Sequence, residues 1–155
     1  MKIVQDEVLS TAQKQSLFQL WNSQYPEKIC YHELTEFENY LDGLSNKSHF
    51  LLLGEKDEIM GCAFSFIRER KDWFAIIVNS EIQGKGFGTL LLDELKKYKS
   101  VLNGWVIDHQ NDFKQNKQRY NSPLPFYIKN DFVICKDTRI ENEKISAVKI
   151  KWERK

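Results

Sequence analysis

Three glycines at alternate positions make up the part of this sequence best suited to chemistry. Gly84, Gly86 and Gly88 follow the apolar run from Trp73 to Val78 and precede a leucine-rich stretch with helical spacing. A strand, loop and helix in this order expose backbone N–H groups that have no helical acceptor, and the helix dipole adds partial positive charge there. Glycine also lets a phosphate approach the backbone closely. The spacing therefore predicts a phosphate-binding loop.

The residue that follows the last glycine excludes two common nucleotide loops. A Walker loop needs Lys-Ser or Lys-Thr after its final glycine, whereas Gly88 is followed by Thr89-Leu90. A dinucleotide-binding fingerprint that starts at Gly84 needs a third glycine where Thr89 stands. On spacing alone, a glycine-rich turn without a ligand remains an alternative.

Two motifs resemble those of the GNAT superfamily of N-acetyltransferases. The segment Gln83-Gly84-Lys85-Gly86-Phe87-Gly88 resembles its Q/R-x-x-G-x-G/A signature, and Phe126-Tyr127-Ile128-Lys129-Asn130-Asp131-Phe132 is similar to its F-Y-x-K-x-G-F segment. The order of predicted elements along the whole chain also resembles the family fold. Three positions depart from the pattern: Asp131 replaces a glycine, Ser80 replaces a proline, and the run 73–78 lacks the glutamate that often serves as base.

The resemblance implies that acetyl-CoA is the cosubstrate and that its acetyl group passes directly to a primary amine of a small molecule, or less commonly of a protein. An alternative is a non-catalytic acyl-CoA-binding module with the same fold, which the missing strand acid favours. The residues that the resemblance places at the cofactor are Val78, Gln83, Gly84, Lys85, Gly86, Phe87, Gly88 and Thr89.

Tyr127 is the predicted general acid, since a phenol with a pKa of about 10 stays protonated at neutral pH and can protonate the leaving thiolate. The alternative is that Tyr127 only packs against the cofactor or a helix. Asp108 and His109 are the candidate bases because they end a strand where ligands bind in α/β sheets. His32 and Glu33 are rival candidates, because the family builds its acceptor wall there.

The elements that must position these residues follow from periodicity and turn chemistry. Seven strands are predicted, at 3–4, 49–53, 59–67, 73–78, 101–107, 132–135 and 145–152. Four helices are predicted: one capped by Ser10, one capped by Thr35 and ended by Gly43 in a left-handed conformation, one after Gly88, and a short one capped by Ser122 with Pro123 at its first position. The polar stretch 109–121 is predicted to be an aperiodic loop beside the acceptor site. The fold class is mixed α/β, with a mostly antiparallel, partly parallel GNAT-like sheet.

Composition limits the partners. A chain of 155 residues fits a single N-acetyltransferase domain, 1–155, and 23 basic against 22 acidic residues give no global reason to expect nucleic acid or a membrane. The three cysteines lack zinc-site spacing, so no metal site is predicted. Without a signal peptide or an apolar span, the expected location is the cytoplasm. A sheet with an open edge also makes a homodimer a possible assembly.

Overall fold

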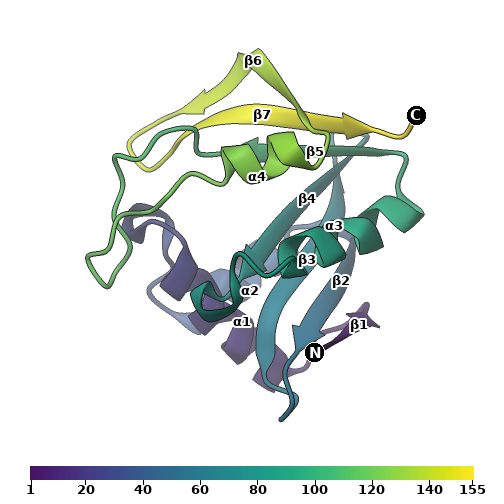
Figure 1. Cartoon of the computed structure of the whole chain (residues 1–155). Helices are drawn as coiled ribbons and strands as arrows, with labels where there is room; N and C mark the ends of the chain where they lie inside the picture. The colour runs from purple at the N-terminus through teal and green to yellow at the C-terminus, as the bar shows by residue number, and fades with distance from the viewer.

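A computed structural model describes all 155 residues and contains one seven-stranded sheet with helices on both faces (Figure 1). The strands are β1 (Lys2–Asp6), β2 (Ser45–Leu53), β3 (Ile59–Arg68), β4 (Lys71–Val78), β5 (Val101–Val106), β6 (Val133–Glu141) and β7 (Ser146–Glu153). The helices are α1 (Thr11–Gln24), α2 (Leu34–Asp42), α3 (Phe87–Tyr98) and α4 (Leu124–Lys129), with 3₁₀ turns η1 (Glu27–Ile29) and η2 (Ser80–Ile82). All seven predicted strands and four predicted helices are present.

The strands lie in the order β1-β2-β3-β4-β5-β7-β6. Every neighbouring pair is antiparallel except β4 and β5, which are parallel. The prediction of a mostly antiparallel, partly parallel sheet is therefore confirmed. The parallel pair requires a crossover connection, and α3 supplies it. The loop that carries the glycines therefore lies at the end of the central strand.

Alternation along β4 divides the core into two layers. Trp73 and Ile77 pack with α1 and α2 on one face, whereas Phe74 packs with the leucines of α3 and with Tyr127 of α4 on the other. The prediction that this apolar run is central and covered on both faces is confirmed. Since both faces are filled by side chains, the strand can present a ligand only with its backbone edge or its end.

The helix starts agree with the sequence in one case and differ in another. Ser10 forms the predicted capping box with Gln13 at the start of α1. The second predicted box is wrong: α2 begins at Leu34, one residue before Thr35, and has no side-chain cap. The earlier start places Leu34 on the face that packs against the core, in line with the buried Phe37 and Leu41. Burial of this face outweighs the capping preference.

Three local conformations bear on the site. Asp131 takes the left-handed φ of +72° that its position requires, as predicted for an Asp in place of glycine. Gly43 does not, since its φ of −76° is right-handed. Strand β6 continues past the predicted end at Cys135 and forms one edge of the sheet. No helix is long and apolar enough to span a bilayer.

Candidate active site

The loop from β4 to α3 is held in shape by side-chain amides. The Asn79 Oδ1 accepts the Glu81 backbone N–H at 2.9 Å and so starts η2. The Gln83 Nε2 donates to the Val78 carbonyl at 2.8 Å and reaches Gln24 at the end of α1 at 3.4 Å. Gln83 therefore ties the loop to both the end of the central strand and α1, which gives the first residue of the motif a structural task.

A continuous row of backbone donors follows Gln83. The N–H groups of residues 84 to 89 donate to no protein acceptor, and the first helical hydrogen bond is from Leu90 to the Gly86 carbonyl. Gly84 and Gly86 have φ of +76° and +89°, and no atom lies within 4 Å of where a Cβ would stand on either. Left-handed backbone of this kind turns successive N–H groups toward one side, as an anion requires. The predicted phosphate-binding loop thus has six free donors and open space around it.

Gly88 has a different task from Gly84 and Gly86. A Cβ on Gly88 would stand 2.9 Å from the Phe126 ring, closer than side-chain carbons approach one another. The start of α3 is therefore in close contact with α4, the helix that carries Tyr127. Glycine at this position sets the distance between the loop and the candidate acid.

Strands β4 and β5 meet at one end and diverge toward the other (Figure 1). Their only paired position is Trp73 with Asn103, and Asn103 is nearly fully buried. The Asn103 side chain donates to the Asp72 carbonyl at 3.0 Å. The edge of β4 from 74 to 78 has no partner strand on this side, so it is free to pair with an extended ligand.

Both faces of this junction are packed with aromatic rings. Trp73 stacks on Trp105 with ring centroids 5.5 Å apart. On the other face Phe74 lies over Gly104, where an added Cβ would stand 2.7 Å from the ring. These contacts close the junction at the paired end, so the two strands separate only in the direction of Val78 and Asp108.

Tyr127 lies beside the diverging strands. Its ring is buried and is held edge-on by Phe74, Phe126 and Phe132, with centroids 5.1 to 5.7 Å apart. Burial raises the pKa of the Tyr127 hydroxyl above its usual value, and the nearby Tyr120 raises it further. The phenol is therefore protonated throughout the neutral range, as a general acid must be.

The predicted bases are already engaged with neighbours. Asp108 accepts two hydrogen bonds from Arg139, at 2.7 and 3.0 Å, and this pairing lowers the pKa of its carboxyl. The His109 Nδ1 accepts the Asn111 backbone N–H at 3.0 Å. Neither group has a free basic atom directed by the structure toward an amine. The rivals His32 and Glu33 are exposed, and Glu33 precedes α2.

The stretch 109–121 contains no helix or strand, as predicted for a loop, and it folds back on itself as a short hairpin held by one isolated β-bridge. Phe113 bridges Arg119 within it, and its carbonyl accepts the Glu27 N–H of η1 at 2.8 Å. At its base the Ser122 hydroxyl donates to the Ile107 carbonyl at 2.6 Å and accepts the Leu124 N–H at 3.2 Å, with Pro123 as N-cap rather than first helical residue. One hydrogen bond to η1 and the turns within the stretch hold its shape, and neither produces a periodic sequence pattern.

This hairpin carries a carboxylate that no sequence motif singles out. Asp112 is 6% exposed and is the one buried acid of the chain. Lys28 of η1 lies 3.4 Å from one of its oxygens and His109 lies 3.8 Å from the other. Asp112 stands among other polar residues in the sequence, and only docking of the hairpin buries it, so no local pattern would have identified it.

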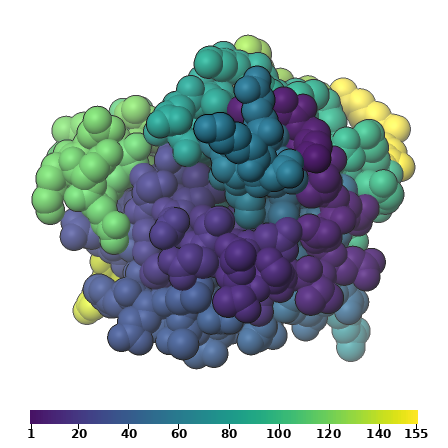
Figure 2. All heavy atoms as spheres, turned by 90° about the horizontal axis from the view of Figure 1, so that it is seen from below, coloured from purple at the N-terminus to yellow at the C-terminus, as the bar shows by residue number.

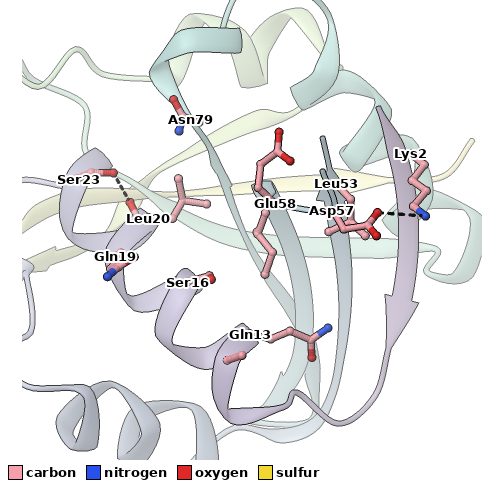
Figure 3. A pocket seen from close by; sticks show the side chains of 12 residues that line it. Lys2, Gln13, Ser16, Gln19, Leu20, Ser23, Leu53, Asp57, Glu58 and Asn79 are labelled. Carbon is pink, nitrogen blue, oxygen red and sulfur yellow. Dashed lines mark hydrogen bonds and ion pairs between the residues drawn. The ribbon is translucent and has the colours of Figure 1, made fainter. Parts of the chain in front are cut away.

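A separate groove of about 660 Å³ runs between α1 and the β2–β3 turn (Figure 3). Its lining includes Gln13, Ser16 and Gln19 of α1 and the Lys2–Asp57 ion pair at 3.3 Å. It contains none of the predicted site residues. The row of free N–H groups, the unpaired strand edge and Tyr127 lie instead at the divergence of β4 and β5, so we assign the chemistry there.

Comparisons with known proteins agree with this geometry. A sequence profile described as "Acetyltransferase (GNAT) domain" matches residues 46–134. The fold is similar to the crystal structure of an aminoglycoside 6'-N-acetyltransferase from Enterococcus faecium, with TM-score 0.72, 16% identity and 99% and 97% of the two chains covered. It is also similar to Escherichia coli ElaA, with TM-score 0.70, 17% identity and 99% and 100% covered.

A third structure of the same fold is a putative phosphinothricin N-acetyltransferase, with TM-score 0.71, 11% identity and 99% of both chains covered. Comparison with curated protein sequences gives no significant match. The profile covers more than half of the chain and includes the glycine loop, β5 and Tyr127. The chain therefore belongs to the GNAT acetyltransferase family.

Proposed function

We propose that this chain is an acetyl-CoA-dependent N-acetyltransferase whose acceptor is a primary amine of a small molecule. The observation that carries the proposal is the row of six unpartnered N–H groups beside the unpaired edge of β4. A pyrophosphate matches the row in charge and in the number of acceptors it offers. An amide-containing arm matches the strand edge. In acetyl-CoA the pyrophosphate joins the adenosine part to an extended arm with two amides, so one molecule carries both groups.

The remaining predicted cofactor residues fit this arrangement. Lys85 is exposed on the loop and adds a positive charge, while Phe87 and Thr89 belong to the first turn of α3 and contribute backbone N–H groups. Val78 ends β4, and Gln83 fixes its carbonyl. Together these residues hold the pyrophosphate and direct the thioester toward Tyr127.

The reaction then needs two proton transfers. The neutral amine attacks the thioester carbonyl carbon, a C–N bond forms, and the C–S bond breaks. The departing thiolate takes its proton from the Tyr127 hydroxyl, and the nitrogen loses a proton to a base, directly or through water. Asp108 and His109 stay candidates for that base only if Arg139 or Asn111 releases them.

Calorimetric titration with acetyl-CoA tests the cofactor site, with Gly86→Glu and Gly86→Gln compared. Both side chains share the strain of a positive φ and almost the same volume, but only Glu adds a charge. Repulsion from the pyrophosphate should weaken binding by a further 10- to 100-fold, roughly 1–3 kcal/mol. If the folded wild type does not bind acetyl-CoA, or if the two variants bind alike, the cofactor assignment is wrong.

The absence of an acid from residues 73–78 of β4 favours a second candidate, the non-catalytic acyl-CoA-binding module. A thiol-release assay across a panel of primary amines separates the two functions. Turnover supports the enzyme, whereas acetyl-CoA binding without turnover of any amine supports the module.

Assembly as a homodimer also stays a proposal. Strand β6 forms an open edge of the sheet and exposes Val133 and Ile134. Unpaired edges with apolar side chains pair readily with a second copy. Analytical ultracentrifugation that finds only monomer at micromolar concentration would contradict it.

A further inference from the structure

The carboxylate of Asp112 is buried but not saturated. Buried carboxylates are normally satisfied by several hydrogen bonds. The side chain of Asp112 accepts no hydrogen bond that meets ordinary geometry; its contacts are the ion pairs with Lys28 and His109, at 3.4 and 3.8 Å. Neither oxygen belongs to the side-chain atoms that are fully enclosed by protein and lack a hydrogen-bond partner. The carboxylate therefore keeps both acceptor capacity and access.

Three tyrosines connect Asp112 with the reacting end of the site. The rings of Tyr25 and Tyr120 lie 6.4 Å apart. After burial, the charge of Asp112 is what raises the pKa of Tyr120, and Tyr120 in turn is what raises the pKa of Tyr127. No protein group hydrogen-bonds to the hydroxyls of Tyr25, Tyr120 or Tyr127, and none of these hydroxyls is fully enclosed by protein. The Tyr120 N–H donates to the Asp112 backbone carbonyl at 2.9 Å, so the phenols that lack a partner and the incompletely satisfied carboxylate belong to one polar region.

We propose that Asp112 binds the acceptor amine as its ammonium, with the hydroxyls of Tyr25 and Tyr120 beside it, before the nitrogen loses one proton to water and attacks as the neutral amine. This inference rests on the proposed acetyltransferase function and names a residue for its acceptor. A primary ammonium has three donors, and the carboxylate with the two phenol oxygens supplies three acceptor groups. The hairpin base tied by Ser122 and Ile107 places this wall directly before α4, where Tyr127 lies.

The surrounding charges limit the acceptor to one ammonium group. The hairpin and η1 carry four cations, Lys28, Lys114, Lys117 and Arg119, against the two acids Glu27 and Asp112. Lys117 pairs with Glu27 at 3.6 Å, and Lys28 already faces Asp112. A second ammonium on the same molecule would meet this positive rim, so a monoamine with a neutral or acidic remainder fits better than a polyamine.

Figure 2 shows residues 109–121 (green) as a lobe that projects from one side of the molecule, where solvent reaches it. Two roles for Asp112 must therefore be separated: binding the amine, or only holding this lobe against η1. Two lysines separate these roles. Lys28 contacts Asp112 directly, whereas Lys117 links the lobe to η1 through Glu27 and does not pair with Asp112.

The experiment measures KM and kcat for the best amine of a panel containing monoamines, amino acids, diamines and an aminoglycoside. In Asp112→Asn we expect the amine KM to rise about tenfold or more, the loss of one charge-assisted contact, with the acetyl-CoA Kd unchanged. In Lys28→Met, which removes a competing cation, the amine KM should fall. In Lys117→Met the amine KM should stay within about twofold of the wild-type value, because the variant removes only an exposed ion pair.

A structural role alone predicts another result, in which all three variants raise the amine KM together and lower the melting temperature. That result, or an unchanged KM in Asp112→Asn, overturns the proposal. So does a panel in which diamines or the aminoglycoside are the best substrates. Failure of the wild type to bind acetyl-CoA or to acetylate any amine overturns the proposed function itself, and is thus distinguishable. Asp112→Glu, which keeps the charge, should restore a KM closer to wild type than Asn does.

Discussion

The cofactor side and the acceptor side of the proposed active site differ in the groups that build them: one uses backbone groups and the other uses side chains. The proposed cofactor side consists of backbone N–H groups from 84 to 89 and the unpaired edge of β4. The proposed acceptor side consists of side chains, Asp112 and three tyrosines, that come from the hairpin, the end of α1 and α4. A site made of backbone groups depends on an unusual backbone conformation, so few residue types can form it. A site made of side chains depends on tertiary contacts, so many different sequences can form one.

The largest effect is expected from the residue that both sides share. Tyr127→Phe should lower kcat by about 10²- to 10⁴-fold, the usual contribution of a general acid, because the thiolate then leaves without a proton. The acetyl-CoA Kd should change little, since the phenyl ring keeps its contacts with Phe74 and Phe132. Steady-state kinetics and calorimetry give both values. Retention of wild-type kcat would leave Tyr127 a packing residue.

The pH profile provides a second test of Tyr127. Burial and Tyr120 raise the pKa of its hydroxyl, so the acid form persists above the ordinary value of about 10. We therefore expect no loss of kcat from Tyr127 ionisation between pH 7 and about 10. A descending limb near pH 8–9 that disappears in Tyr127→Phe would contradict this.

A methyl group at Gly88 should disturb the contact between the two sides. Because its Cβ would meet Phe126 at 2.9 Å, Gly88→Ala should cost about 1–3 kcal/mol of unfolding free energy as an overpacked site. Gly43→Ala is the matched control, since its Cβ has only ordinary contacts at 3.5 Å and a right-handed φ. Denaturant unfolding measures both. Equal stability of the two variants would show that Phe126 moves aside freely.

A smaller effect is expected at the predicted base Asp108. Its bidentate pair with Arg139 is partly exposed, so Asp108→Asn should cost about 0.5–1 kcal/mol of unfolding free energy. The lowered pKa of Asp108 means that this contribution is present above the unfolded value of about 3.9 and is lost as the pH falls further. The amine KM should change much less than in Asp112→Asn. A fall in kcat of a hundredfold or more would instead make Asp108 the base.

The smallest effect concerns a histidine far from both sides. His49 is buried with an unpartnered Nε2, and burial lowers its pKa. The neutral form is favoured in the folded state, so its stabilisation is complete above about pH 6.5 and declines as the pH falls below that value. Unfolding free energies from pH 8 to 5 should show a steeper decline in the wild type than in His49→Phe. Parallel curves would contradict this assignment.

Much of the fold is determined by local pattern. Apolar runs and short polar turns predicted all seven strands, and Ser10 predicted the start of α1. The glycines at 84 and 86 predicted the position of the loop, and its positive φ values are ones that glycine adopts without strain. Asp131 also has a positive φ, and Asp tolerates the left-handed conformation better than most residues. These features depend on one residue and its neighbours in sequence, so the sequence by itself determined them, together with membership of the family.

Other features were decided by the tertiary structure alone. Thr35 lost its capping role because Leu34, which is partly buried, packs against the core on the same face as Phe37. Asp108 lost its freedom to Arg139, which is 31 positions away in sequence. Asp112 became buried because η1 receives the hairpin through the Glu27 N–H. In each case the deciding partner is distant along the chain, and long-range burial and pairing exceed the local preferences that a sequence pattern expresses.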